Sequence, residues 1–446
     1  MIFLKRIFLN LNIILSSLLI IFIFYKSEIF FEGTNRNHYL KYYLFTFSYL
    51  IFSILIYKFS KIVNQIYSLL VFSIVLTLYL FEFFYEKKEY LFEKDLKIKI
   101  KKYKELSGKE WDQRTQYEVY KELLKTNKDV VPYFYPTDLK IDNKLNIFSL
   151  SGVSNSLTVF CNENGYYSVN SSDRYGFNNP DSEWESDVID YVFLGDSFTH
   201  GYCVNRPHDI PSVIRENYNQ NVLNLGYGRS GTLIEYATLR EYVPENIKKI
   251  VLMYYEQNDI ENLESELNYE VLLKYLKDEN FSQNLKEKTS LIDRELKKHI
   301  SSRASGKKYE FIRLNKTRKL ISQVLKKNFY SKNQVIINKD NTFKELEKIL
   351  YLIKKLSIEK KIDFYFVYLP SISRFFENEP NDNKLLYFDE VKSIINKLNI
   401  EFIDINKEVF EKEQNPLMLF PFELEAHYNI EGYKKVADTI YRLTRN

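Results

Sequence analysis

The chain has 446 residues, which is enough for more than one domain. Its formal net charge is only +4, and its Lys and Arg residues are scattered among Asp and Glu, so nothing in the composition indicates a nucleic-acid partner. The two cysteines, Cys161 and Cys203, do not have the spacing of a metal site. They are compatible with one disulfide in an oxidising compartment or with two separate reduced thiols.

Three apolar runs open the chain, at residues 7–25, 44–57 and 66–85. The first and third are long enough to cross a bilayer as helices, and the second reaches that length if residues 40–43 join it. Glu82 lies near one end of the third run, where a charge can reach the lipid headgroups. No small-residue cleavage site follows the first run, which argues against a signal peptide. We therefore predict a membrane anchor with three transmembrane helices in residues 1–88.

The orientation of this anchor is ambiguous, because Lys and Arg flank the apolar runs on both sides. Large domains can be exported whatever their own charge. We therefore expect a multi-pass membrane protein whose large domain lies outside the cytoplasm.

Residues 89–180 are predicted to form a stalk helix and a β-hairpin lead-in. The pattern from Glu86 to about Leu124 is charged and helical. Leu157–Cys161 and Tyr166–Val169 flank a turn that contains glycine, as the strands of a hairpin do. Asp173–Phe177 is expected to be a further lead-in strand.

Residues 181–446 alternate strand and helix signals, which is typical of a parallel sheet covered by helices on both faces. The strands are predicted at Tyr191–Leu194, Val222–Leu225, Ile250–Tyr254, Phe364–Leu369 and Glu401–Ile405. The helices are predicted at Pro211–Tyr218, Thr232–Tyr242, Thr342–Lys360, Phe388–Leu398 and Ile430–Leu443. A charged helical insertion, residues 262–338, separates the third strand from the fourth.

The first predicted strand leads into Gly195-Asp-Ser-Phe-Thr-His-Gly201. Ligands collect outside the carboxyl ends of strands in such sheets, so Ser197 is well placed to be a nucleophile. The α/β-hydrolase elbow is excluded, because Thr199 stands where its second glycine is required. Taken alone, Gly-Asp-Ser is also ordinary turn chemistry.

Three further motifs follow at strand ends or helix starts. They are Asn224-Leu-Gly-Tyr-Gly-Arg-Ser-Gly231, Glu256-Gln-Asn-Asp259 and Glu425-Ala-His-Tyr-Asn-Ile-Glu-Gly432. The glycines of the first do not indicate a dinucleotide site, because they follow the second strand and no acidic residue closes a nearby strand. His427, in the last of these motifs, is one of the chain's five histidines and a candidate general base. His200, three residues after Ser197, is a second candidate that is expected to face away or line the pocket.

These four motifs, in this order, resemble the blocks of the SGNH (GDSL-like) hydrolases. The resemblance implies a flavodoxin-like three-layer α/β/α fold with a parallel sheet, and no metal or organic cofactor. It also implies that Ser197 is the nucleophile and His427 the base. The oxyanion hole would consist of the N–H groups of Ser197 and Gly226 and the side-chain amide of Asn258.

The sequence departs from the family pattern at two positions. Glu256 replaces a glycine of the third block, and Leu424 stands where Asp-x-x-His places the acid. Glu425, two residues before the histidine, is therefore the expected orienting acid, as in relatives that resemble polysaccharide O-acetyltransferases. The alternative is a Ser–His dyad with Glu425 facing solvent.

The acidic neighbours Asp196 and Asp259 are expected to support the site. Asp259 is also compatible with a plain helix N-cap. Together the motifs and the apolar runs predict a membrane-anchored serine esterase that removes acyl groups, acetyl first, from an envelope glycan or lipid. An O-acyltransferase with the same residues and a non-catalytic binding or scaffold protein are the alternatives.

Overall fold

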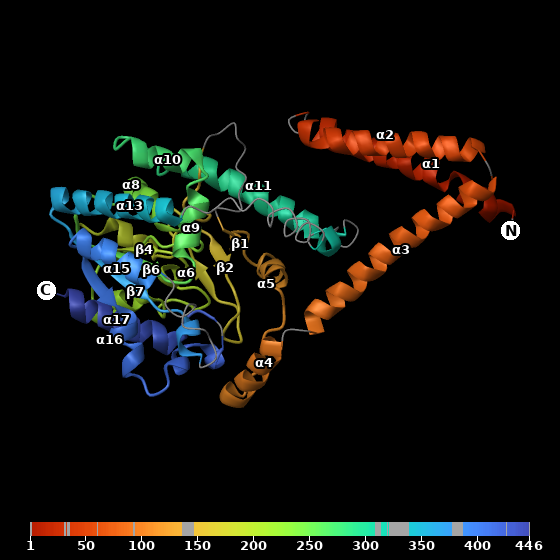
Figure 1. Cartoon of the computed structure of the whole chain (residues 1–446). Coiled ribbons are helices and arrows are strands. Elements are labelled where there is room, and N and C mark those ends of the chain that lie inside the picture. Colours follow the sequence, from red (N-terminus) through yellow and green to blue (C-terminus); the bar gives the residue numbers. More distant parts are fainter. Residues whose placement is uncertain are drawn as a thin grey trace. The chain divides into compact units, whose positions relative to one another are not determined.

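The computed structural model describes residues 2–30, 33, 36–59, 61–91, 94–135, 147–307, 314–318, 320, 339–376, 387–424 and 426–445 (Figure 1). The chain divides into two compact units. One comprises Met1–Phe92 and Lys308–Asn333, and the other comprises Glu93–Lys307 and Gln334–Asn446.

The first unit contains the predicted membrane helices, α1 (Ile2–Phe24), α2 (Arg36–Phe59) and α3 (Lys61–Leu91). Three spans are long and apolar enough to cross a membrane, at Asn10–Ile29, Arg36–Lys58 and Lys61–Phe84. Their large apolar side chains point outward, whereas polar residues fill the interior between the helices. Asn12 of α1 donates to Ser68 of α3 (2.9 Å) and accepts from the hydroxyl of Tyr49 of α2 (2.9 Å). One polar side chain from each helix thus stabilises the bundle, as is usual for helices packed in lipid.

Glu82 of α3 is buried and fully engaged in hydrogen bonds. It accepts from the backbone N–H groups of Lys316 and Thr317 (2.8 Å each) and from the hydroxyl of Thr317 (2.6 Å). A segment of the predicted insertion therefore packs on α3 and compensates the buried carboxylate, whose burial would otherwise be costly.

The predicted stalk is divided into α4 (Lys94–Ser107) and α5 (Gln116–Leu123). The chain turns between them at Gly108, which has a φ of 68°, and α5 begins with a capping box between Thr115 and Glu118. A small sheet follows, in the order β1 (Val130–Pro132), β2 (Leu157–Val159) and β3 (Val169–Ser171). β2 and β3 pair antiparallel, as the predicted hairpin requires. β2 is shorter than predicted, and β3 begins at Val169, the last residue of the predicted strand.

The expected strand at Asp173–Phe177 is wrong, since this segment is a turn. The buried carboxylate of Asp173 organises it by accepting from the N–H groups of Tyr175 (2.9 Å) and Phe177 (3.0 Å). The same carboxylate accepts from the side chains of Asn179 (2.9 Å) and Trp184 (2.8 Å). A side chain that satisfies nearby backbone donors stabilises a turn in place of a strand.

The main sheet confirms all five predicted strands. They are β4 (Ile189–Gly195), β5 (Val222–Asn224), β6 (Ile247–Tyr255), β7 (Asp363–Leu369) and β8 (Glu401–Asp404). All pairs are parallel, and the order is β5-β4-β6-β7-β8. This is the flavodoxin-like order. The second strand, β5, is added on one side of the first strand, β4, and the later strands β6, β7 and β8 are added on its other side.

Helices cover both faces of this sheet, which makes the three-layer α/β/α architecture that was predicted (Figure 1). Alternate residues of β4 enter two different cores, with Val192 and Leu194 in one and Tyr191 and Phe193 in the other. The first core is closed mainly by α8 (Thr232–Tyr242), α13 (Lys339–Lys360) and α15 (Phe388–Lys397). The second is closed by α7 (Ile210–Tyr218) and α17 (Ile430–Thr444). The insertion contributes α9 (Asp259–Glu266), α10 (Glu270–Lys277) and α11 (Thr289–Lys307).

Candidate active site

The candidate nucleophile lies on a sharp turn at the carboxyl end of β4. Gly195 has a φ of 149°, and a Cβ there would lie 2.0 Å from Oγ1 of Thr199, so this position requires glycine. The next residue, Asp196, caps α6 (Ser197–His200) by accepting from the N–H of Phe198 (2.9 Å). Burial raises the pKa of the Asp196 carboxyl. The turn thereby presents Ser197 as the first residue of a helix, where backbone N–H groups have no partner within the helix.

The structure brings Ser197 and His427 together, although they are 230 residues apart. The hydroxyl oxygen of Ser197 lies 2.8 Å from Nε2 of His427 and 3.3 Å from Oδ2 of Asp196. The imidazole is packed between the rings of Phe198 and Tyr202, each with its centroid 4.7 Å away. His427 is therefore fixed at the position from which it can take the serine proton.

The carboxylate at the other side of the imidazole is Glu163. Its Oε1 and Oε2 lie 3.1 Å and 3.2 Å from Nδ1 of His427, and Oε2 also accepts from the backbone N–H of His427 (2.9 Å). A carboxylate at Nδ1 places the ring proton there, so Nε2 is left as the acceptor for the hydroxyl of Ser197. The expected acid, Glu425, lies outside the described residues.

Glu163 was missed because it lies in the turn of the predicted hairpin, 264 residues before the histidine. The two cysteines were the available signal. Cys161 and Cys203 form a disulfide with a Cα–Cα distance of 5.0 Å, which joins the turn that carries Glu163 to the loop that follows α6. The side chain of Asn164 adds a hydrogen bond to the carbonyl of Cys203 (3.0 Å). A covalent and a hydrogen-bonded link therefore hold the turn of Glu163 beside the loop that follows α6.

The pKa shifts of the pair follow from burial and from mutual attraction. Burial by itself would raise the pKa of Glu163, but the charge and hydrogen bonds of His427 outweigh it, and the pKa of this carboxyl is lowered. Burial would lower the pKa of His427, but Glu163 and, to a smaller extent, Asp196 raise it above the ordinary value. The imidazolium form is thus stabilised, which a general base needs while it holds the serine proton.

Two of the expected oxyanion-hole residues, Gly226 and Asn258, differ in the hydrogen bonds that they make. The N–H of Gly226 donates to Oδ1 of Asn224 (3.0 Å), so the structure does not support Gly226 as an oxyanion donor. A Cβ at Gly226 would lie 2.5 Å from Cβ of Thr199, so this glycine allows the loop to pack on α6. Asn258 is half-buried, and its side chain makes no capping hydrogen bond to α9.

The departure at Glu256 has a structural explanation. The side chain is buried, and its oxygens accept from the N–H of Ser371 and from the guanidinium of Arg374, with Nε at 2.7 Å from Oε1. Asp259 is also buried and accepts from the N–H of Tyr255 (2.7 Å). It therefore closes the turn between β6 and α9, and Asn258 occupies the cap position.

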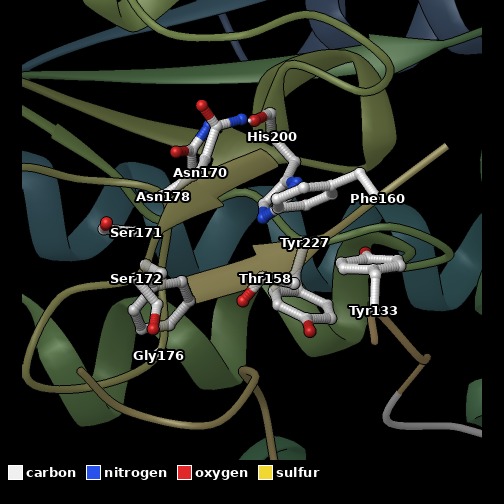
Figure 2. Close-up of a pocket in the computed structure, with 11 residues that line it drawn as sticks. Tyr133, Thr158, Phe160, Asn170, Ser171, Ser172, Gly176, Asn178, His200 and Tyr227 are labelled. Atoms are coloured by element: carbon white, nitrogen blue, oxygen red, sulfur yellow. Dashed lines mark hydrogen bonds between the residues drawn. The ribbon is translucent and has the colours of Figure 1, made fainter. Parts of the chain in front are cut away.

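His200 is buried and lines a small cavity. Figure 2 shows its ring beside that of Phe160, with Tyr227 and Tyr133 nearby, and the ring centroids lie 4.8, 5.0 and 5.3 Å away. Burial lowers the pKa of His200 to about 3. It lines the cavity, as one of the sequence expectations stated.

Among the described residues, Glu163, Cys203 and His427 form a group with the spacing of metal ligands. The sulfur of Cys203 is bonded to Cys161, so it is not available as a thiolate ligand. The remaining two side chains contact each other, with the carboxylate of Glu163 at Nδ1 of the His427 imidazole.

The fold and site together define an α/β protein with serine, histidine and glutamate aligned at the carboxyl edge of a parallel sheet. Similar solved structures are lipolytic proteins and esterases. A lipolytic protein of the G-D-S-L family from Desulfitobacterium hafniense DCB-2 is 14% identical, and the match covers 57% of this chain and 98% of that one with a TM-score of 0.33. The acetyl xylan esterase AlAXEase is 12% identical, and the match covers 57% of this chain and 100% of that one with a TM-score of 0.32. A member of the lipolytic protein G-D-S-L family from Veillonella parvula DSM 2008 is 15% identical, and the match covers 58% of this chain and 100% of that one with a TM-score of 0.30.

No protein-family model matches the sequence, and no curated protein matches it.

Proposed function

We propose that this protein is a membrane-anchored serine ester hydrolase with Ser197 as nucleophile, His427 as general base and acid, and Glu163 as the orienting carboxylate. The observation that carries the proposal is the continuous alignment of three groups. The hydroxyl of Ser197 lies 2.8 Å from Nε2 of His427, and Nδ1 lies 3.1 Å from Glu163. A structural histidine needs only one such partner, whereas nucleophilic catalysis needs both.

The geometry supports a two-step acyl transfer. Nε2 of His427 takes the proton from Ser197 as its oxygen attacks the ester carbonyl, and the tetrahedral oxyanion accepts hydrogen bonds from the N–H of Ser197 and the amide of Asn258. The imidazolium, stabilised by Glu163, then protonates the leaving alcohol. Water attacks the acyl-enzyme with His427 again as base, and the acid is released.

The substrate proposed is an acyl ester, with acetyl as the first to test, on a glycan or lipid of the cell envelope. Three helices that are long and apolar enough to cross a membrane support a location at a membrane. The disulfide between Cys161 and Cys203 supports an oxidising compartment for the catalytic unit, because cytosolic thiols are kept reduced.

The test combines activity with active-site labelling of the full-length protein in detergent. We expect hydrolysis of p-nitrophenyl acetate and modification of Ser197 by a fluorophosphonate, both lost in Ser197→Ala with a fall in kcat of at least about 10³-fold. Formation of an acetyl sugar without free acetate, when an oligosaccharide acceptor is added, would identify a transferase instead. Labelling of no residue would show that the site is not catalytic.

A further inference from the structure

Helix α4 contacts two segments of the proposed catalytic site that are far apart in the chain. One is the turn Asn162–Gly165, which carries Glu163. The other is the short helical segment Pro421–Glu423, which lies in the loop that leads to His427. The helix, the turn and the loop all belong to the same compact unit.

Tyr103 of α4 packs on the turn that carries Glu163. A Cβ at Gly165 would lie 2.4 Å from Cε2 of Tyr103, so the tyrosine ring lies directly on the backbone of this glycine. The segment that follows α4 adds hydrogen bonds to the same turn. The N–H of Asp112 donates to the carbonyl of Gly165 (2.9 Å), and the side chain of Asn162 donates to the carbonyl of Asp112 (2.8 Å). Packing and hydrogen bonds therefore hold the turn of Glu163 on α4 and the segment after it.

The ring of Tyr103 also packs against the loop that leads to His427. Its centroid lies 6.2 Å from that of Phe422, and the two rings are perpendicular. The ring of the buried Trp111 lies 5.8 Å from each of them. Aromatic pairs at these distances stabilise a contact beyond the apolar area that they bury. Tyr103 thus contacts both the turn of the proposed acid and the loop of the proposed base.

Lys102, the preceding residue of α4, binds the backbone of the same loop. Its Nζ donates to the carbonyl of Phe422 (2.8 Å) and to Oε2 of Glu423 (2.9 Å). Phe422 and Glu423 each have a φ of 59°, a conformation that non-glycine residues rarely adopt. Such a backbone persists only where its surroundings hold it, and Lys102 supplies part of that support.

We propose that Tyr103 and Lys102 are positioning residues of the esterase site, which hold the turn of Glu163 in register with the loop of His427. The register matters because Glu163 accepts from the backbone N–H of His427 (2.9 Å) and lies 3.1 Å from Nδ1 of its imidazole. Both contacts are within hydrogen-bond range, so a small shift of either segment breaks them. This inference rests on the esterase function proposed above and adds an element outside the α/β core to its active site.

The kinetic test uses the full-length variants Tyr103→Ala, Tyr103→Phe and Lys102→Met in detergent, with p-nitrophenyl acetate as substrate. Turnover is expressed per site that a fluorophosphonate labels at completion, so unfolded protein is not counted. We expect Tyr103→Ala to lower kcat per labelled site at least about 10-fold with little change in KM, because a misplaced catalytic group slows the chemical step. Tyr103→Phe should retain the wild-type value, since it keeps the ring. Lys102→Met should lower kcat by a smaller factor, because the aromatic contacts remain.

The matched control is Lys101→Met, because Lys101 lies on the same helix with its side chain 78% exposed. It should leave kcat unchanged. Equal kcat in Lys102→Met and Lys101→Met would overturn the role of Lys102. If Tyr103→Ala lowers only the labelled fraction, with kcat per labelled site at the wild-type value, the ring acts on stability alone and its positioning role is overturned.

Hydrogen exchange separates this inference from the esterase function. In Tyr103→Ala, we expect faster exchange in the peptides that contain Gly165 and the backbone N–H of His427, and wild-type exchange in Tyr103→Phe. Unchanged exchange of both peptides in Tyr103→Ala would overturn the inference even if the wild-type protein hydrolyses esters. Faster exchange in a protein whose wild type neither hydrolyses esters nor labels at Ser197 would contradict the esterase function alone.

Discussion

His427 is held between two oxygen partners that lie far apart in the sequence, and each contributes a different property. The hydroxyl of Ser197 contacts Nε2 of the imidazole, and the carboxylate of Glu163 contacts Nδ1. The carboxylate favours the tautomer whose proton is on Nδ1, which leaves Nε2 as the basic nitrogen. Removing the charge but not the shape of Glu163 therefore tests the role of the carboxylate directly.

Glu163→Gln should lower kcat by about 10² to 10⁴-fold, because the amide can stabilise the wrong tautomer and cannot stabilise the imidazolium. It should also shift the pH profile. His427 must be neutral to act as base, and Glu163 raises its pKa, so activity in wild type rises as the pH passes above that raised value. The variant loses this attraction, and the acid limb of kcat/KM should move to lower pH. The measurement is the pH–rate profile with p-nitrophenyl acetate.

Glu425→Gln is the matched comparison, because Glu425 is the acid expected from the sequence. It should retain most of the activity and the wild-type pH profile. A large loss in Glu425→Gln with little change in Glu163→Gln would show that the sequence-based assignment is correct and that the contact of Glu163 is structural.

The ion pair of Glu256 and Arg374 is buried, and it concerns stability and not catalysis. The side chain of Arg374 is 9% exposed and that of Glu256 is 3% exposed, so removing either partner leaves a buried charge. We expect Arg374→Met to lower the free energy of unfolding of the catalytic unit by about 3–5 kcal/mol. The double variant Glu256→Met, Arg374→Met should lose less, because no uncompensated charge remains. Denaturant titration of both variants measures the difference, and equal losses would contradict the explanation.

At the scale of elements, the small sheet and its turn complete a site whose other parts come from the α/β core. The disulfide joins the turn between β2 and β3 to the loop after α6, and the same turn carries Glu163. The predicted catalytic region began at residue 181, but the carboxylate at His427 comes from the preceding lead-in. These elements belong to the same compact unit.

The double variant Cys161→Ser, Cys203→Ser should therefore lose activity while remaining folded. Without the covalent link the turn of Glu163 gains freedom, and displacement of a catalytic group by about 1 Å can cost on the order of 10²-fold in rate. The effect should be absent when the variant is combined with Glu163→Gln, because the carboxylate that the link positions is already lost. Steady-state kinetics of the three variants provides the measurement. An equal loss in the presence and absence of Glu163 would mean that the disulfide acts on stability alone.

At the scale of the whole molecule, the disulfide bears on where the catalytic unit is located. We expect peptide mapping of protein alkylated in intact cells, without reduction, to recover Cys161 and Cys203 as one cross-linked peptide pair. This result follows if the unit is exported, because oxidising compartments preserve disulfides. Recovery of both cysteines alkylated would place the unit in the cytoplasm, and the Cys161→Ser, Cys203→Ser variant is the control for labelling.

The membrane unit and the α/β unit differ in how completely their sequences predicted them. The apolar runs identified three helices because length and hydropathy alone make a span possible. They did not predict that Asn12, Tyr49 and Ser68 meet between the helices, since that contact depends on helix rotation and packing. Nor did they predict that Glu82 binds the insertion, because its partners lie more than 230 residues away in the chain.

The sequence by itself determined the features that depend on neighbouring residues. These are the candidate membrane spans, the five parallel strands, most of the helices that cover them, and the turn that carries Ser197, since local apolar periodicity and glycine conformation specify each. Only the tertiary structure decided which carboxylate contacts His427, that the amide of Gly226 already has a partner, and that the two cysteines pair. Those contacts form when distant loops pack together, and the balance of burial, charge and hydrogen bonding that selects them is absent from any local stretch of the chain.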